Sequence, residues 1–180
     1  MSAVLLERAV SYTLGSLVLV GPELLGNRTP CARWDLRALL DHMNDSLLAL
    51  AEAADLGHVA LRPTGCEGDP VAMLRRRACR LLGAWPTVSR CSQVAVGDAW
   101  LAREAVAGVG AIEVAVHGWD VAAACGHARP VPEPLAAALL DLALAFVDDD
   151  DRPHRFHAPV RPASPARSSD RLLAFLGRSA

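Results

Sequence analysis

The chain has 180 residues, of which 52% are hydrophobic, 21% charged and 4% aromatic. This length fits one domain that buries a substantial core without disulfide bonds, so we expect residues 1–180 to form a single unit. Ala and Leu dominate the composition, which favours helix-on-helix packing and predicts an all-α fold. The formal net charge of −2 offers no basic surface for nucleic acid, and the absence of lysine excludes Schiff-base chemistry on that residue.

The cysteines and the apolar segments bear on the cellular compartment. Five cysteines without CxxC spacing indicate neither a disulfide framework nor a zinc ribbon: Cys31, Cys66, Cys79, Cys91 and Cys125. The N-terminal segment lacks a basic stretch before its apolar part, which argues against a signal peptide. The apolar segment 105–125 carries two carboxylates, which argues against a membrane span. We therefore expect a cytoplasmic protein without a membrane partner.

Apolar side chains recur at helical spacing in several segments of the chain. They predict helices, in chain order, over residues 2–20, from an N-cap at Asp35 to about Asp55, from Asp69-Pro70 through Leu82, from Asp98 or Ala102 to Gly126, and over Leu135 to Val147. A short helix over Asp170 to Leu176 is expected to dock the end of the chain on the other helices.

Turn-forming residues separate the predicted helices. Residues 26–31 and 57–69 are expected to be loops, and residues 87–97 a short strand or an irregular crossover. The stretch 152–169 is rich in Pro, Arg and Ser, which predicts an irregular arm. Together with the short helix, this arm is expected to dock residues 152–180 on the rest of the domain.

The segment Ala105 to Cys125 is apolar or small apart from one indole and three polar residues: Glu113, His117 and Asp120. A helix here would be buried nearly all round, and the polar residues would share one stripe because they are spaced four and three apart. Buried polar groups need partners. Either Glu113 and His117 hydrogen-bond to each other as a structural pair, or they converge on a cation.

Three segments of the chain together suggest a family. They are TPCARWDLRALLDH at 29–42, EVAVHGWDVA at 113–122 and DRLLAFLGR at 170–178. In this order they resemble the DinB-like helical bundles, in the actinobacterial branch related to the N-terminal domain of mycothiol-dependent maleylpyruvate isomerase. The resemblance implies an up-and-down four-helix bundle, here with an irregular C-terminal arm and a short terminal helix.

The same resemblance implies a divalent metal, held by a His of the second helix and a Glu-x-x-x-His pair of a later one. These ligands correspond to His42, Glu113 and His117. Two imidazoles and one carboxylate leave a coordination position open, as in catalytic metal sites. Zinc is the expected metal, and nickel, iron and cobalt suit the same ligands. Asp41 and Asp120 are candidates for orienting the imidazoles, with a surface carboxylate or a local cap as the alternative for each.

In that family, the open metal position binds the thiolate of a low-molecular-weight thiol such as mycothiol, which adds to an electrophilic substrate. The expected function is therefore a metal-dependent thiol transferase or isomerase acting on a small molecule, with mycothiol as the candidate cosubstrate. Two alternatives remain: a biosynthetic enzyme that drives cyclisation or rearrangement without a thiol, and a non-catalytic protein that binds a small molecule and confers resistance. The characterised isomerases carry an additional C-terminal α/β domain, so maleylpyruvate isomerisation itself is not expected.

Cys31 is expected to be a small buried thiol near a helix start, with a nucleophilic role as the alternative. Trp34 and Trp119 are expected to anchor packing. In the arm, His154 and His157 are candidates for a fourth metal ligand, with simple exposure as the alternative. A cationic partner for a substrate carboxylate has three candidates: Arg33, Arg37 and Arg161. The expected oligomer is a homodimer, in which two chains pair through a helix face.

Overall fold

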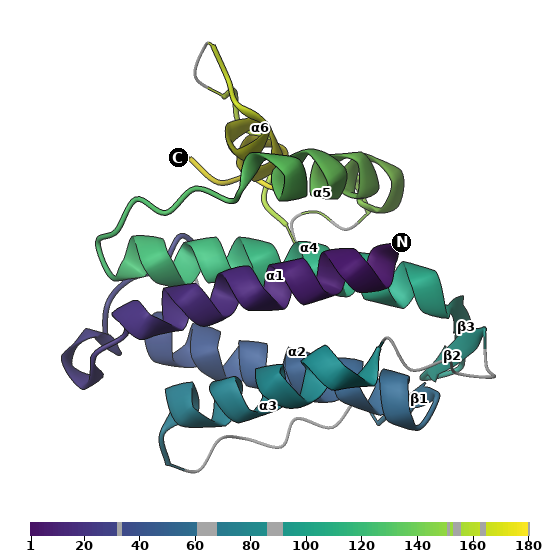
Figure 1. Ribbon diagram of the computed structural model, residues 1–180. Helices are drawn as coiled ribbons and strands as arrows, with labels where there is room; N and C mark the ends of the chain where they lie inside the picture. Colours follow the sequence, from purple (N-terminus) through teal and green to yellow (C-terminus); the bar gives the residue numbers. More distant parts are fainter. Residues whose placement is uncertain are drawn as a thin grey trace.

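The computed structural model describes residues 1–31, 34–60, 68–85, 92–150, 152, 156–162 and 165–179. Helices make up most of this part of the chain, and a small sheet completes it (Figure 1). The α-helices are α1 (Ser2–Ser16), α2 (Leu36–Asp55), α3 (Pro70–Ala84), α4 (Arg103–Ala124), α5 (Glu133–Phe146) and α6 (Ser168–Phe175). The short 3-10 helices are η1 (Leu17–Leu19) and η2 (Pro22–Leu24), and the strands are β1 (His58–Val59), β2 (Gln93–Val96) and β3 (Ala99–Ala102).

The helices lie in three layers, with α5 and α6 on one side, α1 and α4 in the middle, and α2 and α3 on the other side (Figure 1). Besides packing on α1, helix α4 contacts α2 in one outer layer and α5 in the other. α4 is therefore the central helix of the molecule. This position explains why its sequence is apolar on nearly every side, since each side meets another element.

The predicted helices are confirmed to within a few residues of their ends. α2 begins after Asp35, whose side chain accepts a hydrogen bond from the backbone N–H of Ala38. α3 begins after Asp69, which caps it in the same way, with Pro70 as its first residue. α4 ends before Gly126, whose φ of 77° is typical of the glycine that follows a helix.

The all-α prediction is right for most of the described chain but missed a three-stranded sheet with the order β1-β2-β3. β1 pairs in parallel with β2, and β2 pairs antiparallel with β3. The prediction of a short strand within residues 87–97 is right for β2. The other two strands are corrections, because β1 lies in the predicted loop 57–69 and β3 precedes α4, where a helix start at Asp98 is predicted. Strands this short carry too little alternation to be predicted, and only their pairing defines them.

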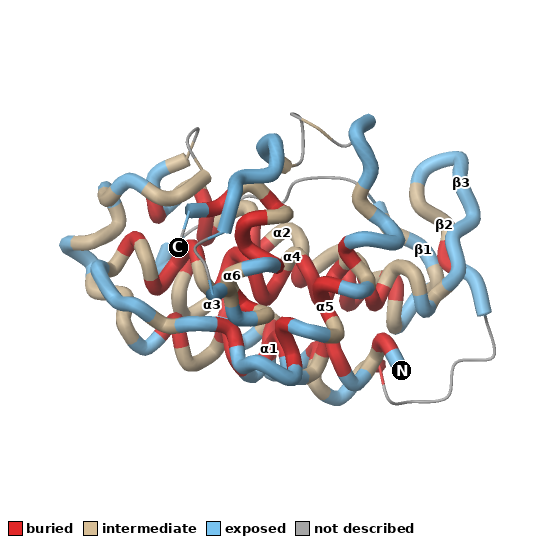
Figure 2. The backbone as a smooth tube through the Cα atoms, turned by 90° about the horizontal axis from the view of Figure 1, so that it is seen from above, coloured by how far each residue is buried: buried red, intermediate tan, exposed pale blue. Residues whose placement is uncertain are grey.

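Two glycines of α4 let neighbouring helices approach closely. A Cβ atom at Gly118 would lie 2.4 Å from Oγ1 and 3.2 Å from Cα of Thr13 on α1. A Cβ atom at Gly110 would lie 2.6 Å from the side chain of Leu50 on α2. Thr13 also donates its hydroxyl to the carbonyl of Val114 at 2.8 Å. These contacts fix α1 and α2 against α4, and buried residues gather along the helices in the middle of the molecule (Figure 2).

Two helical stretches are long and apolar enough to cross a membrane, Ser2–Leu19 and Arg103–Ala124. Length and composition alone do not separate such stretches from core helices. In this molecule 72% of the apolar window of the second stretch and 50% of that of the first are buried against other elements. This burial is consistent with core helices of a soluble protein.

The end of the chain returns to the central helix. α6 packs on α5 and buries Leu172 and Leu173. After α6, Gly177 adopts a φ of 78°, and the backbone N–H of Arg178 bonds to the carbonyl of Leu173 at 2.8 Å. This turn directs Arg178 inward, where it is only 3% exposed. The described residues of the predicted arm before α6 form neither helix nor strand, as expected.

Candidate metal site

α2 contributes two polar side chains to the face that packs on α4. His42 and Ser46 are four residues apart and therefore lie on the same side of the helix. Nε2 of His42 lies 2.9 Å from Oε1 of Glu113 on α4, and the hydroxyl of Ser46 donates to the same oxygen at 2.5 Å. The packing of α2 on α4 thus places two donors around one carboxylate oxygen.

Glu113 is held as a carboxylate. Burial by itself raises the pKa of its carboxyl group. The hydrogen bond from His42, the positive charges of His117 and His42, and the hydrogen bond from Ser46 outweigh this effect and lower the pKa to about 2. Because metal ligands must be deprotonated, Glu113 is ready to bind a cation without losing a proton at neutral pH.

His117 follows Glu113 by one helical turn and is buried. Its Nδ1 lies 3.0 Å from Oδ2 of Asp120. Burial raises the pKa of Asp120, but its hydrogen bond with His117 and the charge of Arg178 outweigh burial, so the net pKa is lowered. An ionised carboxylate only accepts hydrogen bonds, so Nδ1 carries a proton, and in the neutral imidazole Nε2 is then the nitrogen with the lone pair. Among the described residues Nε2 has no hydrogen-bond partner, and a carboxylate behind the opposite nitrogen is the usual arrangement for a metal-binding histidine.

The three residues implied by the family resemblance come together in the structure. One ligand atom from each of His42, Glu113 and His117 lies within 4.8 Å of the other two. The two imidazole rings meet edge to face with centroids 5.2 Å apart, and the indole of Trp34 lies 4.5 Å from the His42 ring. The side chains of His42 and Glu113 are 35% and 33% exposed, whereas that of His117 is 10% exposed. The cluster is therefore open to solvent on the side of His42 and Glu113.

A second group with metal-ligating atoms lies behind His117, formed with Cys31 and Asp120. Nη2 of Arg178 already lies between these groups, 3.0 Å from Oδ2 of Asp120 and 3.1 Å from Sγ of Cys31. Its Nε also approaches Oδ1 of the same carboxylate at 3.4 Å. A metal here would have to displace a buried guanidinium cation. The first group, with His42 and Glu113, is therefore the candidate metal site.

Sequence reasoning missed Arg178. The residue lies in the segment 170–178 that resembles the family. Helical periodicity relates residues within one helix, so it gave no link between Arg178 and α4. The usable signal is its place directly after Gly177, because a glycine turn at the end of an apolar helix can send the next side chain back toward the core.

The Cys31 thiol is half-buried and donates to Oδ2 of Asp120 at 3.5 Å. Burial and the negative charge of Asp120 raise its pKa to about 12, although the nearby Arg178 lowers it. The thiolate is the nucleophilic form of cysteine, and this environment keeps the thiol neutral. The surroundings of Cys31 favour the interpretation as a structural thiol over the nucleophilic alternative.

The side chain of Asp41 contacts a residue of its own helix and none of the candidate ligands among the described residues. Its Oδ2 is 4.0 Å from Nε of Arg37, one turn earlier on α2. Within the described part of the chain, Asp41 makes no hydrogen bond or ion pair with His42 or His117. Of the two carboxylates considered for orienting an imidazole, Asp120 is the one in contact with it.

The remaining candidates pack on the core, are exposed, or lie outside the described residues. Trp119 packs against the hydrophobic core, as does Trp34 beside His42. His157 and Arg161 are exposed. Four residues named from the sequence lie outside the described part of the chain: Arg33, Cys66, Cys91 and His154.

The chain is similar to two proteins of Mycobacterium tuberculosis, the uncharacterized proteins MT0763 and Rv0738 from strains CDC 1551 / Oshkosh and ATCC 25618 / H37Rv. Each is 26% identical over 181 residues, which cover 96% of this chain and 95% of the relative. The similarity thus extends over the whole domain and both of its site-bearing helices. No family model and no solved structure matches the chain.

Proposed function

We propose that the protein is a metal-dependent thiol transferase or isomerase of the DinB-like class that works in the cytoplasm. Its metal ligands are His42, Glu113 and His117, and α1 to α4 are the four-helix bundle of that class. The observation that carries the proposal is the convergence of the three ligand atoms within 4.8 Å of one another. The orientation of His117 by Asp120 is the second support.

The donor set fits a divalent metal. Tetrahedral zinc has ligand distances of about 2.0–2.1 Å, which places neighbouring ligand atoms roughly 3.4 Å apart. The three ligand atoms lie within 4.8 Å of one another, so side-chain rotations that bring them to this spacing would close the cluster around an ion. Glu113 is ionised, and the Nε2 lone pair of His117 is available. Zinc suits two imidazoles and a carboxylate best, and nickel, iron and cobalt remain compatible with them.

A bound divalent metal lowers the pKa of a coordinated thiol or water and so supplies a nucleophile at neutral pH. Three protein ligands leave room for such a molecule, and the partial exposure of His42 and Glu113 marks the side from which it enters. Cys31 does not serve as the nucleophile, because its thiol is neutral and donates to Asp120. In this proposal the thiolate comes from a cosubstrate.

The cosubstrate is a low-molecular-weight thiol of the mycothiol type, as the family resemblance implies. The two relatives belong to a mycobacterium, which agrees with the actinobacterial branch of that resemblance. The second substrate is a small electrophile that accepts the sulfur. Trp34, which lies beside the His42 ring, offers an apolar surface next to the open side of the cluster.

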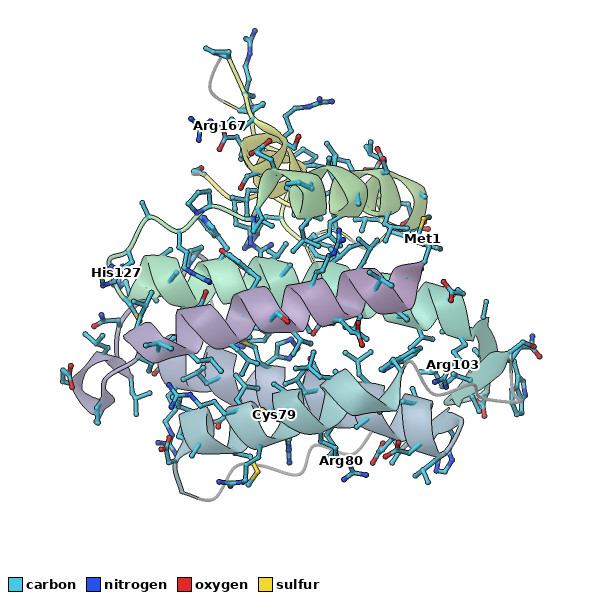
Figure 3. All side chains as sticks on the ribbon, viewed as in Figure 1. Met1, Cys79, Arg80, Arg103, His127 and Arg167 are labelled. Atoms are coloured by element: carbon cyan, nitrogen blue, oxygen red, sulfur yellow. The ribbon has the colours of Figure 1, made fainter. Side chains whose placement is uncertain are left out.

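Elemental analysis of the purified, untagged protein tests the metal site. We expect about one zinc, nickel, iron or cobalt ion per chain in the wild type, and loss of the ion in His42→Ala and in His117→Ala. His127→Ala is the matched control, because His127 is an exposed histidine beyond the end of α4 (Figure 3). A wild type that holds no metal, even after metal supplementation during expression, contradicts the proposal.

A turnover assay then tests the reaction class. Consumption of both a thiol and an electrophile by the metal-loaded protein supports thiol transfer. Turnover of a substrate without thiol favours the biosynthetic alternative, and binding without turnover favours a small-molecule binding or resistance protein. Both of the latter outcomes contradict the transferase proposal while leaving the metal site intact.

A further inference from the structure

The carboxylate of Asp120 bonds to both His117 and Arg178, and its Oδ2 also accepts from the Cys31 thiol at 3.5 Å. Toward the candidate metal site, its Oδ2 receives Nδ1–H of His117 at 3.0 Å. The same oxygen receives Nη2 of Arg178 at 3.0 Å, and Oδ1 receives Nε of Arg178 at 3.4 Å. The guanidinium therefore contacts both oxygens and sets the rotation of the carboxylate about its own axis.

Burial makes this arrangement rigid. Asp120 is 0% exposed and Arg178 is 3% exposed, so water does not compete for either group. A third bond runs from Nη1 of Arg178 to the backbone carbonyl of Leu176 at 2.8 Å, which ties the guanidinium to the end of the C-terminal helix. A buried charge that loses its partner is strongly destabilised, so Asp120 and Arg178 hold each other in place.

The path of the backbone delivers Arg178 to this position. A Cβ atom at Gly177 would lie 2.6 Å from Cβ and 2.9 Å from the carbonyl carbon of His157, so the turn passes closely over the arm. Buried Leu172, Leu173 and Leu176 anchor the helix before the turn. Gly177 and Arg178 are therefore part of the wall behind His117.

We propose that Arg178 is a positioning residue of the metal site, which acts through Asp120 to hold His117 with its proton on Nδ1 and its Nε2 lone pair toward His42 and Glu113. The inference rests on the proposed metal site for its functional meaning. The tautomer and orientation of His117, which the inference predicts, can be measured in the protein without metal.

The test compares Arg178→Met and Arg178→Lys with the wild type. Long-range proton–nitrogen NMR spectra of the metal-free, nitrogen-15-labelled proteins report which imidazole nitrogen of His117 carries the proton, and a His117→Gln spectrum assigns its signals. We expect the Nδ1–H form in the wild type, a mixture of tautomers in Arg178→Met, and a spectrum closer to the wild type in Arg178→Lys. The lysine keeps one charged donor for Asp120 but loses the second contact.

Zinc affinity is the second readout. Replacing a residue that orients a ligand costs 10–100-fold in metal affinity, so we expect Arg178→Met to bind zinc roughly 10-fold more weakly, with partial recovery in Arg178→Lys. Arg171→Met is the matched control, because Arg171 is an exposed arginine of the same C-terminal helix. Circular dichroism establishes that each variant is folded.

The outcomes separate this inference from the proposed function. A folded Arg178→Met with the wild-type tautomer overturns the inference, whatever its zinc affinity. If Arg178→Met does not fold, Asp120→Asn with the arginine intact replaces it, and an unchanged tautomer there overturns the inference. A wild type that binds no zinc contradicts the proposed function, while the spectra of the metal-free proteins still decide the role of Arg178.

Discussion

Nε2 of His42 lies 2.9 Å from Oε1 of Glu113, so α2 and α4 meet through an imidazole–carboxylate pair. Without metal the two groups satisfy each other, which makes the cluster stable in an empty protein. A cation competes with that hydrogen bond for the same two atoms. The pair therefore links the stability of the helix packing to the chemistry of the site, and this link can be measured.

Glu113→Gln should flatten the acid dependence of stability. The pKa of Glu113 falls from 4.5 to about 2 on folding, so the ionised group stabilises the fold above pH 4.5 and loses this contribution as the pH falls toward 2. Urea unfolding of the metal-free proteins between neutral and acidic pH should show a smaller loss in the variant. Glu23→Gln, which changes an exposed glutamate of η2, serves as the control. If the free energy of unfolding of Glu113→Gln falls with acid as steeply as that of the wild type, the lowered pKa of Glu113 is contradicted.

Cys31 should react slowly with alkylating reagents. Its pKa of about 12 leaves very little thiolate at neutral pH, so we expect alkylation at least about 100-fold slower than at an exposed cysteine. Cys79 is the internal reference, because its side chain lies exposed on α3 (Figure 3). Mass spectrometry of peptides after timed iodoacetamide treatment gives both rates in one sample. Comparable rates at the two positions would show that Cys31 is a reactive thiol.

Gly118→Ala should destabilise the fold by about 1–3 kcal/mol, the usual cost of overpacking a buried contact. The added methyl would press on the hydroxyl and the backbone of Thr13, and the backbone of a packed helix cannot simply move aside. Gly83→Ala is the contrasting variant, since a Cβ atom there meets no atom of the described residues within 4 Å. It should stabilise α3 by roughly 0.5–1 kcal/mol through helix propensity. Chemical denaturation measures both, and equal effects of the two substitutions would refute the close approach of α1 to α4.

Asp35→Ala should cost about 1 kcal/mol of stability, because the helix that carries His42 loses its N-cap. Asp35→Asn should remain near the wild type, since an asparagine side chain accepts the same hydrogen bond. Thermal unfolding compares the two substitutions. If the alanine and asparagine variants have the same melting temperature, the hydrogen bond from the Ala38 N–H to the Asp35 side chain contributes nothing to the stability of α2.

The spacing of residues along the chain was enough to predict the helices and the two candidate ligands that share one helix. Glu113 and His117 lie four apart in an apolar helix, so any α-helix over this segment puts them on one face. The caps at Asp35 and Asp69 bond only within their own turns and were predictable for the same reason. Such features depend on interactions between near neighbours, which local sequence determines.

Features that join distant segments depend on packing, and only the tertiary structure decided them. The contact of His42 with Glu113 requires α2 to lie on α4, which the residues alone left open and the family resemblance implied. The short strands exist only through their pairing, so no periodicity indicated β1 or β3. Arg178 reaches Asp120 because buried leucines and a glycine turn bring the chain end to the central helix. An ion pair between residues so far apart in sequence forms only when the core that buries it has formed.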